Sequence, residues 1–259
     1  MKAVILAGGL GTRISEESHL RPKPMIEIGG KPILWHIMKI YSHYGINDFV
    51  ICGGYMVHFI KQYFADYYMR HSDITFDFTA DGSMEIHSND VEPWRVTVVD
   101  TGMNSMTGGR IKRIKKYVEG ERFFVTYGDG VSDINLDKLL KIHIDSGKTV
   151  TLSAVQPGGR FGTLDISDSD NTVLGFREKV QADNAWINAG FMVMEPEVFD
   201  YIDGDDTVLE REPMGRLSAD GKLGSFQHTG FWQCMDTLRD KEYLESLWES
   251  GDAKWKLWK

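Results

Sequence analysis

Residues 2–13 read KAVILAGGLGTR, an unbroken apolar run followed at once by a loop with three glycines in four positions. Such an apolar run predicts a strand that is buried on both faces, as in a parallel sheet. Glycines allow positive φ and let successive N–H groups approach an anion, and Arg13 adds a planar, permanently charged group that suits phosphate oxygens. The stretch therefore predicts an α/β fold with a phosphate-binding loop after its first strand.

Two other kinds of phosphate loop do not fit the sequence. The dinucleotide fingerprint requires a third glycine where the chain has Ile14, which argues against an NAD-dependent sugar dehydrogenase. The P-loop requires Gly-Lys followed by Ser or Thr, with a further glycine upstream. Gly147-Lys148-Thr149 has Ile142 at that upstream position, and Gly30-Lys31 is followed by Pro32.

The order of the expected elements supports the α/β assignment. Helical spacing of apolar residues predicts helices over 31–44, 57–69, 107–118, 135–146 and 237–248. Apolar or alternating runs predict strands over 2–7, 48–52, 95–99, 122–127, 149–155, 162–166, 172–176, 186–194 and 223–228, and a hairpin over 74–79 and 84–88. No repeat or linker interrupts the chain, so one unit over 1–259 is predicted, with a small β-rich lobe as the alternative for the last hundred residues.

The composition excludes several classes of protein. A net charge of −9 argues against nucleic-acid binding, which depends on lysine and arginine neutralising phosphates. Cys52 and Cys234 form neither a disulfide framework nor a metal-binding spacing, which favours a reducing compartment. The first apolar run is too short for a signal-peptide core, and no segment approaches a membrane span. The sequence predicts a soluble, cytoplasmic protein that binds neither nucleic acid nor membrane.

A lysine ten residues beyond the loop strengthens the interpretation. Lys23 stands between two prolines in RPKP, so its ammonium can be aimed with little loss of entropy. Together, LAGGLGTR, PKPM and GGKPIL resemble the sugar-1-phosphate nucleotidyltransferase family. The resemblance continues through VEPWRVTVVDTG, SMTGGRIKR, TYGDGV and GFWQCMDTLRDKEYLE, and these segments look like members that join CTP to glucose 1-phosphate.

The resemblance covers essentially the whole chain and implies a Rossmann-like nucleotidyltransferase fold. Its sheet would be mixed but mostly parallel, with flanking helices, a nucleotide-binding part over about 1–150 and a small β-rich sugar-binding part over about 151–259. It also implies one magnesium ion, release of pyrophosphate and a homo-oligomer, which is a hexamer in the best-known relatives. The product would be CDP-glucose, a precursor of CDP-linked deoxysugars in bacterial surface polysaccharide.

Two aspartates are the candidate metal ligands. Asp129 follows a predicted buried strand within Gly128-Asp129-Gly130, where an open α/β sheet binds its ligands, although an Asp-Gly turn would also explain it. Magnesium prefers oxygen ligands and commonly takes one or two carboxylates together with substrate phosphate. Asp236 precedes the last predicted helix and could equally cap it. The resemblance assigns Asp236 as the second metal ligand.

The resemblance also assigns the substrate contacts. For the nucleotide it gives Leu6, Ala7, Gly8, Gly9, Leu10, Gly11, Thr12, Arg13, Lys23, Ser105, Arg110 and Gly128. For the sugar phosphate it gives Gly162, Glu178, Lys179 and Asn188, with Val180 replacing the proline that is usual after the lysine. Arg13, Lys23, Asp129 and Asp236 would be catalytic.

Three alternatives stay open from the sequence. The base could be uracil, thymine or guanine, because base choice depends on a few loop contacts. The chain could be a non-catalytic regulatory subunit that binds a sugar nucleotide. Trp248, Trp255 and Trp258 near the tail could contact a neighbouring subunit or fold back on their own chain.

Overall fold

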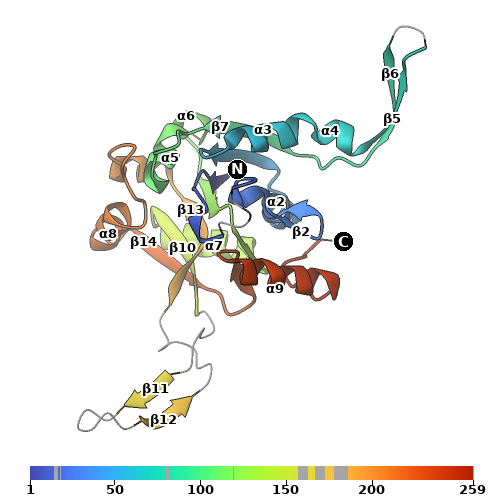
Figure 1. Cartoon of the computed structure of the whole chain (residues 1–259). Helices are drawn as coiled ribbons and strands as arrows, with labels where there is room; N and C mark the ends of the chain where they lie inside the picture. The colour runs from blue at the N-terminus through green and yellow to red at the C-terminus, as the bar shows by residue number, and fades with distance from the viewer. Residues whose placement is uncertain are drawn as a thin grey trace.

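Seven strands form the central sheet in the order β14-β10-β13-β8-β1-β4-β7 (Figure 1). The structure, a computed structural model, describes residues 1–14, 17, 19–79, 82–118, 120–156, 163–166, 173–177 and 186–258, and of Arg13, 163–166 and 173–177 only the backbone. Strand β13 is antiparallel to β8 and β10, and the other pairings in the sheet are parallel. The strands are β1 (Ala3–Ala7), β4 (Asp48–Gly53), β7 (Arg95–Asp100), β8 (Phe123–Tyr127), β10 (Val150–Val155), β13 (Ile187–Met194) and β14 (Leu223–Gln227). The prediction of a mixed, mostly parallel sheet is confirmed.

Helices cover both faces of this sheet. Side chains alternate along β1, so Ala3, Ile5 and Ala7 enter one hydrophobic core while Val4 and Leu6 enter the other. The first core contains α2 (Ile33–His43), α7 (Leu136–Ser146) and α9 (Leu238–Glu249). The second contains α5 (Thr107–Arg113), α6 (Lys115–Val118), the 3-10 helix η4 (Pro196–Tyr201) and α8 (Glu212–Ala219). A strand buried on both faces is what its unbroken apolar sequence predicted.

Several shorter pieces lie outside the central sheet. The predicted helix over 57–69 is two helices, α3 (Val57–Ala65) and α4 (Tyr67–Arg70), and η1 (Thr12–Ile14) and η2 (Lys23–Met25) are 3-10 turns. Two-stranded ribbons are formed by β2 (Glu27–Ile28) with β3 (Lys31–Pro32), β5 (Ser72–Asp77) with β6 (Ser83–Asn89), β9 (Gly130–Ser132) with β15 (Trp232–Cys234), and β11 (Thr163–Ile166) with β12 (Val173–Arg177). The predicted hairpin over 74–79 and 84–88 is confirmed as β5–β6.

Two strands of the C-terminal third belong to the central sheet. Strand β13 pairs with β8, and β14 pairs with β10, so both extend the central sheet. The part over about 151–259 was expected to be β-rich, but it also contains the helices η4 and α8. The division into a nucleotide-binding and a sugar-binding part stays a prediction.

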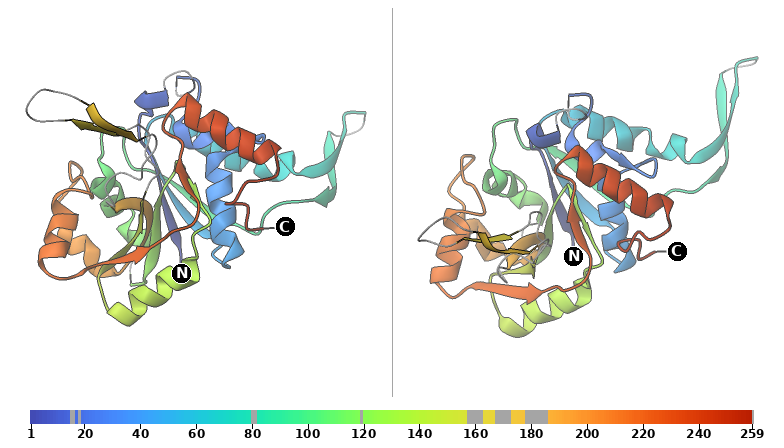
Figure 2. Two further views of the ribbon diagram at one scale, coloured as in Figure 1. Left: turned by 90° about the horizontal axis from the view of Figure 1, so that it is seen from below. Right: turned by 60° about the horizontal axis from the view of Figure 1, so that its bottom comes forward.

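The C-terminal tryptophans fold back on their own chain. Trp255 is fully buried, and its ring lies 6.1 Å from that of His36 in α2 and 6.4 Å from that of Trp248. Helix α9 accordingly lies against α2 in both views of Figure 2. Among the described residues, no helix has the length and apolar character needed to cross a membrane.

Candidate active site

A cavity of about 370 Å³ opens where β1 and β8 end. Most of the expected nucleotide residues line it, namely Leu6, Ala7, Gly8, Gly9, Gly11, Thr12, Lys23, Ser105, Arg110 and Gly128. Leu10 is half exposed and does not line it, and the side chain of Arg13 lies outside the description. The cavity therefore unites residues from segments that are a hundred positions apart in the sequence.

Close packing requires glycine at two positions of this cavity, and backbone conformation favours it at a third. A Cβ on Gly8 would lie 2.2 Å from Nη1 of Arg110, and one on Gly128 would lie 3.0 Å from the carbonyl oxygen of Leu6. Gly11 has φ 65°, which side-chain-bearing residues rarely adopt. The N–H of Gly128 donates to the carbonyl of Leu6 at 2.9 Å, which joins the two strand ends at the cavity floor.

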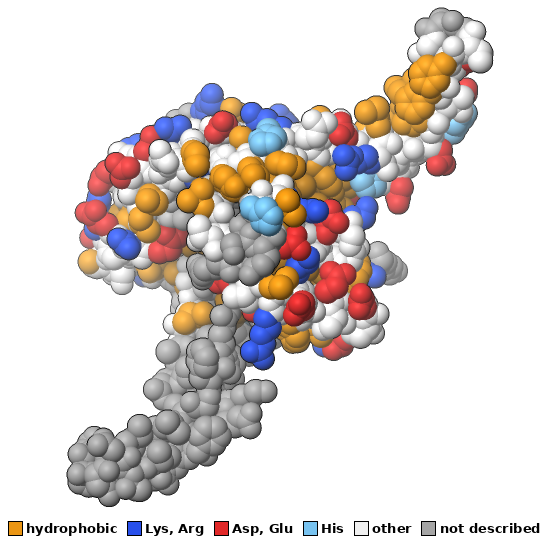
Figure 3. Space-filling model, in the orientation of Figure 1, with side chains coloured by type: hydrophobic (Ala, Val, Ile, Leu, Met, Phe, Trp, Pro, Cys, Tyr) orange, Lys and Arg blue, Asp and Glu red, His pale blue; other side chains and the backbone are white. Residues whose placement is uncertain are grey.

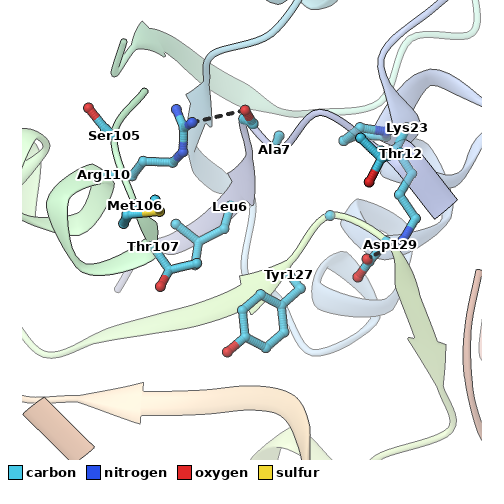
Figure 4. Close-up of a pocket in the computed structure, with 15 residues that line it drawn as sticks. Leu6, Ala7, Thr12, Lys23, Ser105, Met106, Thr107, Arg110, Tyr127 and Asp129 are labelled. Carbon is cyan, nitrogen blue, oxygen red and sulfur yellow. Dashed lines mark hydrogen bonds and ion pairs between the residues drawn. The ribbon is translucent and has the colours of Figure 1, made fainter. Parts of the chain in front are cut away.

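Arg110 is buried behind the glycine loop. Its Nη2 donates to the carbonyl of Gly8 at 2.9 Å, a contact drawn in Figure 4. The guanidinium also donates to the hydroxyl of Thr101 and to the carbonyls of Gly53, Gly102 and Met103. Burial lowers the pKa of Arg110 from its usual value. Nη2 thus holds the glycine loop at Gly8, while Nη1 bonds the end of β4 and the segment that follows β7. Direct contact between Arg110 and a nucleotide stays a prediction.

Lys23 lies between the two candidate metal ligands. Its Nζ is 2.7 Å from Oδ2 of Asp129 and 2.6 Å from Oδ1 of Asp236 (the first pair is seen in Figure 4). Burial alone would lower the pKa of Lys23, but attraction to Asp129 and hydrogen bonds to both carboxylates outweigh it and raise the pKa. Pro22 precedes the 3-10 turn and Pro24 lies within it, so the two prolines flank the lysine as the sequence suggested.

The far end of the chain brings Asp236 to Asp129. Strand β15 pairs with β9 so that Cys234 faces Gly130, and the N–H of Met235 donates to the carbonyl of Asp129 at 2.8 Å. The cap of α9 is a capping box formed by Thr237 and Asp240, not by Asp236. The alternative of a purely capping role for Asp236 is therefore removed, because its carboxylate meets Lys23 instead.

The two carboxylates fit a magnesium ion. Both approach one ammonium group within hydrogen-bond distance, so their oxygens converge on a cation. The described part of the chain holds no group of three or more His, Cys, Asp or Glu side chains that could complete a metal site. Two carboxylates, supplemented by substrate phosphate and water, are what magnesium commonly uses.

A second cavity of about 360 Å³ adjoins the first and shares Tyr127 and Asp129 with it. Asn188 lines this second cavity, together with Trp232 and Glu210. Gly162, Glu178 and Lys179, as well as Val180, lie outside the described residues. Asp129 lines both cavities, whereas Asp236 lines only the second and Lys23 only the first. The ion-paired group therefore spans the boundary between the two spaces.

Sequence reasoning missed a hydrogen-bonded group at this boundary. The Tyr127 hydroxyl donates to Oε1 of Glu210, and the Thr107 hydroxyl donates to Oε2 of Glu210 at 2.6 Å. Asn188 donates to the Tyr127 oxygen at 3.4 Å. Burial, followed by the charge of Glu210, raises the pKa of Tyr127 well above its usual range, so the phenol stays a donor. The position of Tyr127 directly before Gly128 was a usable signal, whereas Glu210 lies in a segment without a motif.

Comparison with known proteins decides the family. The chain is 57% identical to glucose-1-phosphate cytidylyltransferase of Salmonella typhi, with both chains covered completely. Residues 2–219 match the nucleotidyl transferase family. The chain belongs to the glucose-1-phosphate cytidylyltransferase family of nucleotidyl transferases. This family membership makes the chain an enzyme.

Two further similarities agree with that membership. A probable glucose-1-phosphate cytidylyltransferase of Bacillus subtilis is 42% identical over the full length of both chains. The crystal structure of HddC from Yersinia pseudotuberculosis superposes with a TM-score of 0.69 at 25% identity and covers 95% of this chain and 99% of that one. The fold expected for a nucleotidyltransferase is therefore confirmed for this cytidylyltransferase family member.

Proposed function

We propose that the enzyme transfers the cytidylyl group of CTP to α-D-glucose 1-phosphate, giving CDP-D-glucose and pyrophosphate. The observation that carries this proposal is the bridge from Asp129 through Lys23 to Asp236, at the boundary of two adjoining cavities. Two anionic reactants need a cationic centre between them, and one cavity for each reactant on either side of it supports a transfer between a nucleotide and a sugar phosphate. Full-length similarity to enzymes named for this reaction supports the choice of substrates.

The proposed chemistry is a single in-line displacement. A phosphate oxygen of glucose 1-phosphate forms a bond to the α-phosphorus of CTP while the bond to the β-phosphate oxygen breaks, and pyrophosphate leaves with that electron pair. The attacking oxygen is already anionic, so no general base is needed. Catalysis then rests on positioning and on stabilisation of charge.

Each residue has a part in this proposal. Asp129 and Asp236 would hold magnesium, which supplies positive charge against the reacting phosphates when it is bound. Lys23 neutralises charge on the α-phosphate, and Arg13 with the loop N–H groups stabilises the departing pyrophosphate. Lys179, assigned by the family resemblance, holds the sugar phosphate.

Three further attributes belong to the same proposal. We propose that magnesium is the metal used in the cell, that the enzyme works in the cytoplasm, and that copies of the chain assemble into a homo-oligomer. The oxygen-only pair of Asp129 and Asp236 supports magnesium over metals that prefer nitrogen or sulfur ligands.

The test is pyrophosphate release from glucose 1-phosphate with CTP, UTP, dTTP, GTP and ATP in turn, in magnesium and in EDTA. CTP should lead the panel, and Asp236→Asn should abolish turnover while the thermal unfolding profile stays cooperative. Lys39→Met, which removes a lysine paired with Glu92 away from both cavities, is the matched control. A different leading nucleotide would overturn the cytidylyl specificity. Turnover with none of the five would favour a sugar-nucleotide-binding subunit without catalysis.

A further inference from the structure

Lys23 lies in η2, a 3-10 turn of only three residues. A hydrogen bond from the N–H of Ile26 to the carbonyl of Lys23 at 3.1 Å closes this turn. Such a local bond shapes the turn but does not determine where it stands relative to Asp129 and Asp236, which come from distant parts of the chain. Contacts on either side of η2 must therefore place the ammonium group between the two carboxylates.

Two such contacts come from one face of α9. Lys241 forms an ion pair with Glu17, and the carboxylate of Glu245 accepts the N–H of Gly29 at 3.0 and 3.1 Å. Because Lys241 and Glu245 are four residues apart in the helix, their side chains lie on the same face. Glu17 is six positions before Lys23, and Gly29 is six positions after it. The helix therefore holds this segment at two points, with Lys23 midway between them in the sequence.

The ion pair between Lys241 and Glu17 is partly shielded from solvent. Its two side chains are 24% and 21% exposed, whereas those of the pair between Lys141 and Asp145 in α7 are 75% and 60% exposed. Water screens a shielded pair less, so its charges attract each other more strongly than those of an exposed pair. The contact is therefore suited to restrain the chain at Glu17.

Short-range hydrogen bonds connect Glu17 to the turn that carries Lys23. The carbonyl of Glu17 accepts the N–H groups of Leu20 at 3.0 Å and of Arg21 at 3.3 Å. The side chain of Arg21 then donates to Glu27 at 2.9 Å, on the other side of η2. A displacement of Glu17 would therefore displace the backbone that leads into Lys23.

Lys241 lies in the same turn of α9 that holds Asp236. The N–H of Asp236 donates to Oδ2 of Asp240 at 3.1 Å, and the N–H of Lys241 donates to the carbonyl of Thr237 at 3.1 Å. These bonds join Asp236, the capping residues and Lys241 within one turn. That turn therefore fixes Asp236 directly, and through the ion pair it also restrains the segment that carries Lys23.

The charge of α9 makes a cation necessary at this contact. The helix contains four carboxylates and two cations, and Figure 3 shows acidic side chains on the surface over α9. Without Lys241, the carboxylate of Glu17 would face a helix that is negative on balance, and the two would repel each other. Loss of the lysine should therefore move the segment away from α9.

We propose that Lys241 is a positioning residue for the transfer reaction, because through Glu17 it holds Lys23 where the ammonium meets Asp129 and Asp236. Lys241 acts on the reaction only through these residues and does not touch the substrates. This role rests on the proposed function, in which Lys23 acts on the α-phosphate of the nucleotide.

The glycine loop has anchors that do not involve Lys241. Arg110 donates to the carbonyl of Gly8, and η1 ends at Ile14, which is fully buried. Loss of the ion pair should therefore leave the loop that binds the phosphates in place while Lys23 is displaced. The rate of the reaction should suffer more than the binding of CTP.

The kinetics of pyrophosphate release test this role. Lys241→Met should lower kcat about fivefold and change the KM for CTP by less than about twofold, whereas Lys241→Arg keeps the charge and should retain the wild-type kcat. Glu17→Gln should lower kcat as Lys241→Met does, and the double variant should lower it no further, because both changes remove the same pair. Lys141→Met, which breaks an exposed pair, is the matched control and should keep the wild-type kcat. A normal kcat in Lys241→Met, or single effects that add in the double variant, would refute the proposal.

Hydrogen–deuterium exchange tests the ion pair without turnover. Peptides that cover residues 19–29 should exchange about fivefold faster in Lys241→Met than in the wild type, and at the wild-type rate in Lys141→Met. Unchanged exchange in Lys241→Met would refute the restraint, and faster exchange with a normal kcat would refute the positioning role. A wild type without turnover would refute the proposed function and with it the role in the reaction, while the exchange would still show whether the pair holds the segment.

Discussion

Replacing Lys23 by methionine should make the stability of the enzyme depend on magnesium. In the wild type the ammonium lies between two carboxylates, at 2.7 Å from Asp129 and 2.6 Å from Asp236. Methionine keeps most of the side-chain volume but removes the positive charge. The two carboxylates would then repel each other until another cation arrives.

The size of this repulsion follows from the geometry. Because both carboxylate oxygens lie within hydrogen-bond distance of one nitrogen, they are at most about 5 Å apart, which gives about 3 kcal/mol at an effective dielectric constant of about 20. The side chain of Asp129 is 30% exposed, so solvent screening reduces the loss to about 1–2 kcal/mol. For a chain of this length the melting temperature should fall by about 2–8 °C in EDTA.

Thermal unfolding in EDTA and in saturating magnesium measures the effect. Magnesium should raise the melting temperature of Lys23→Met more than that of the wild type, because it no longer competes with an ammonium for the same oxygens. Lys39→Met loses an ion pair to Glu92 and is the control, since its melting temperature should respond to magnesium as the wild type does. An equal magnesium response in Lys23→Met and wild type would refute the shared cation site.

Three other perturbations have defined outcomes. Arg110→Lys should lower the free energy of unfolding in urea by about 3 kcal/mol and raise the KM for CTP, because buried carbonyls such as that of Gly8 lose their donor. The control is Arg113→Lys at an exposed ion pair, which should change the free energy of unfolding by about 0.5 kcal/mol or less. Glu210 lines the second cavity, and we expect it to accept a hydrogen bond from a sugar hydroxyl there. Glu210→Gln should then raise the KM for glucose 1-phosphate up to about tenfold, and a matching rise in the KM for CTP would argue against this role. Burial lowers the pKa of His36 to about 4, so the unfolded chain takes up the proton first and stability should fall by about 2 kcal/mol between about pH 7 and pH 5. His36→Gln should flatten this dependence, and an unchanged slope in urea unfolding would contradict it.

Local sequence patterns were enough to predict the central strands, but they did not predict all elements of the C-terminal third of the chain. The run AVILA is apolar throughout because β1 is buried on both faces, so its unbroken apolar character identified it. Helix α8 was missed because it begins after Arg211 with no side-chain cap and includes Pro213 and Gly215, which are poor helix formers. The pairing of β14 with β10 depends on contacts some seventy residues apart, which no local pattern reports.

Some residues of the candidate site could likewise be predicted from local sequence, and others could not. The glycine loop and Lys23 were readable because backbone freedom and proline flanks are properties of neighbouring residues. Asp236 was ambiguous because a carboxylate before a helix is chemically the same whether it caps the helix or faces a cation. The distinction came from Thr237 and Asp240, which form the cap between themselves. Glu210 could not be found, because its role arises only when Tyr127 and Thr107 meet it in space.

The segment between Lys23 and the first long helix packs against α9, near the opposite end of the chain. The N–H of Gly29 donates to both carboxylate oxygens of Glu245 in α9, at 3.0 and 3.1 Å. Gly29 has φ 58°, and a Cβ there would lie 1.9 Å from Nε1 of Trp248. The glycine is therefore needed both for its backbone conformation and for the close approach of α9. Because Asp236 lies just before α9, the same contact that anchors this helix also fixes how far Asp236 stands from Lys23 and Asp129. The residues that shape the phosphate loop and those that anchor the last helix thus act on one site, although more than two hundred positions separate them in the sequence.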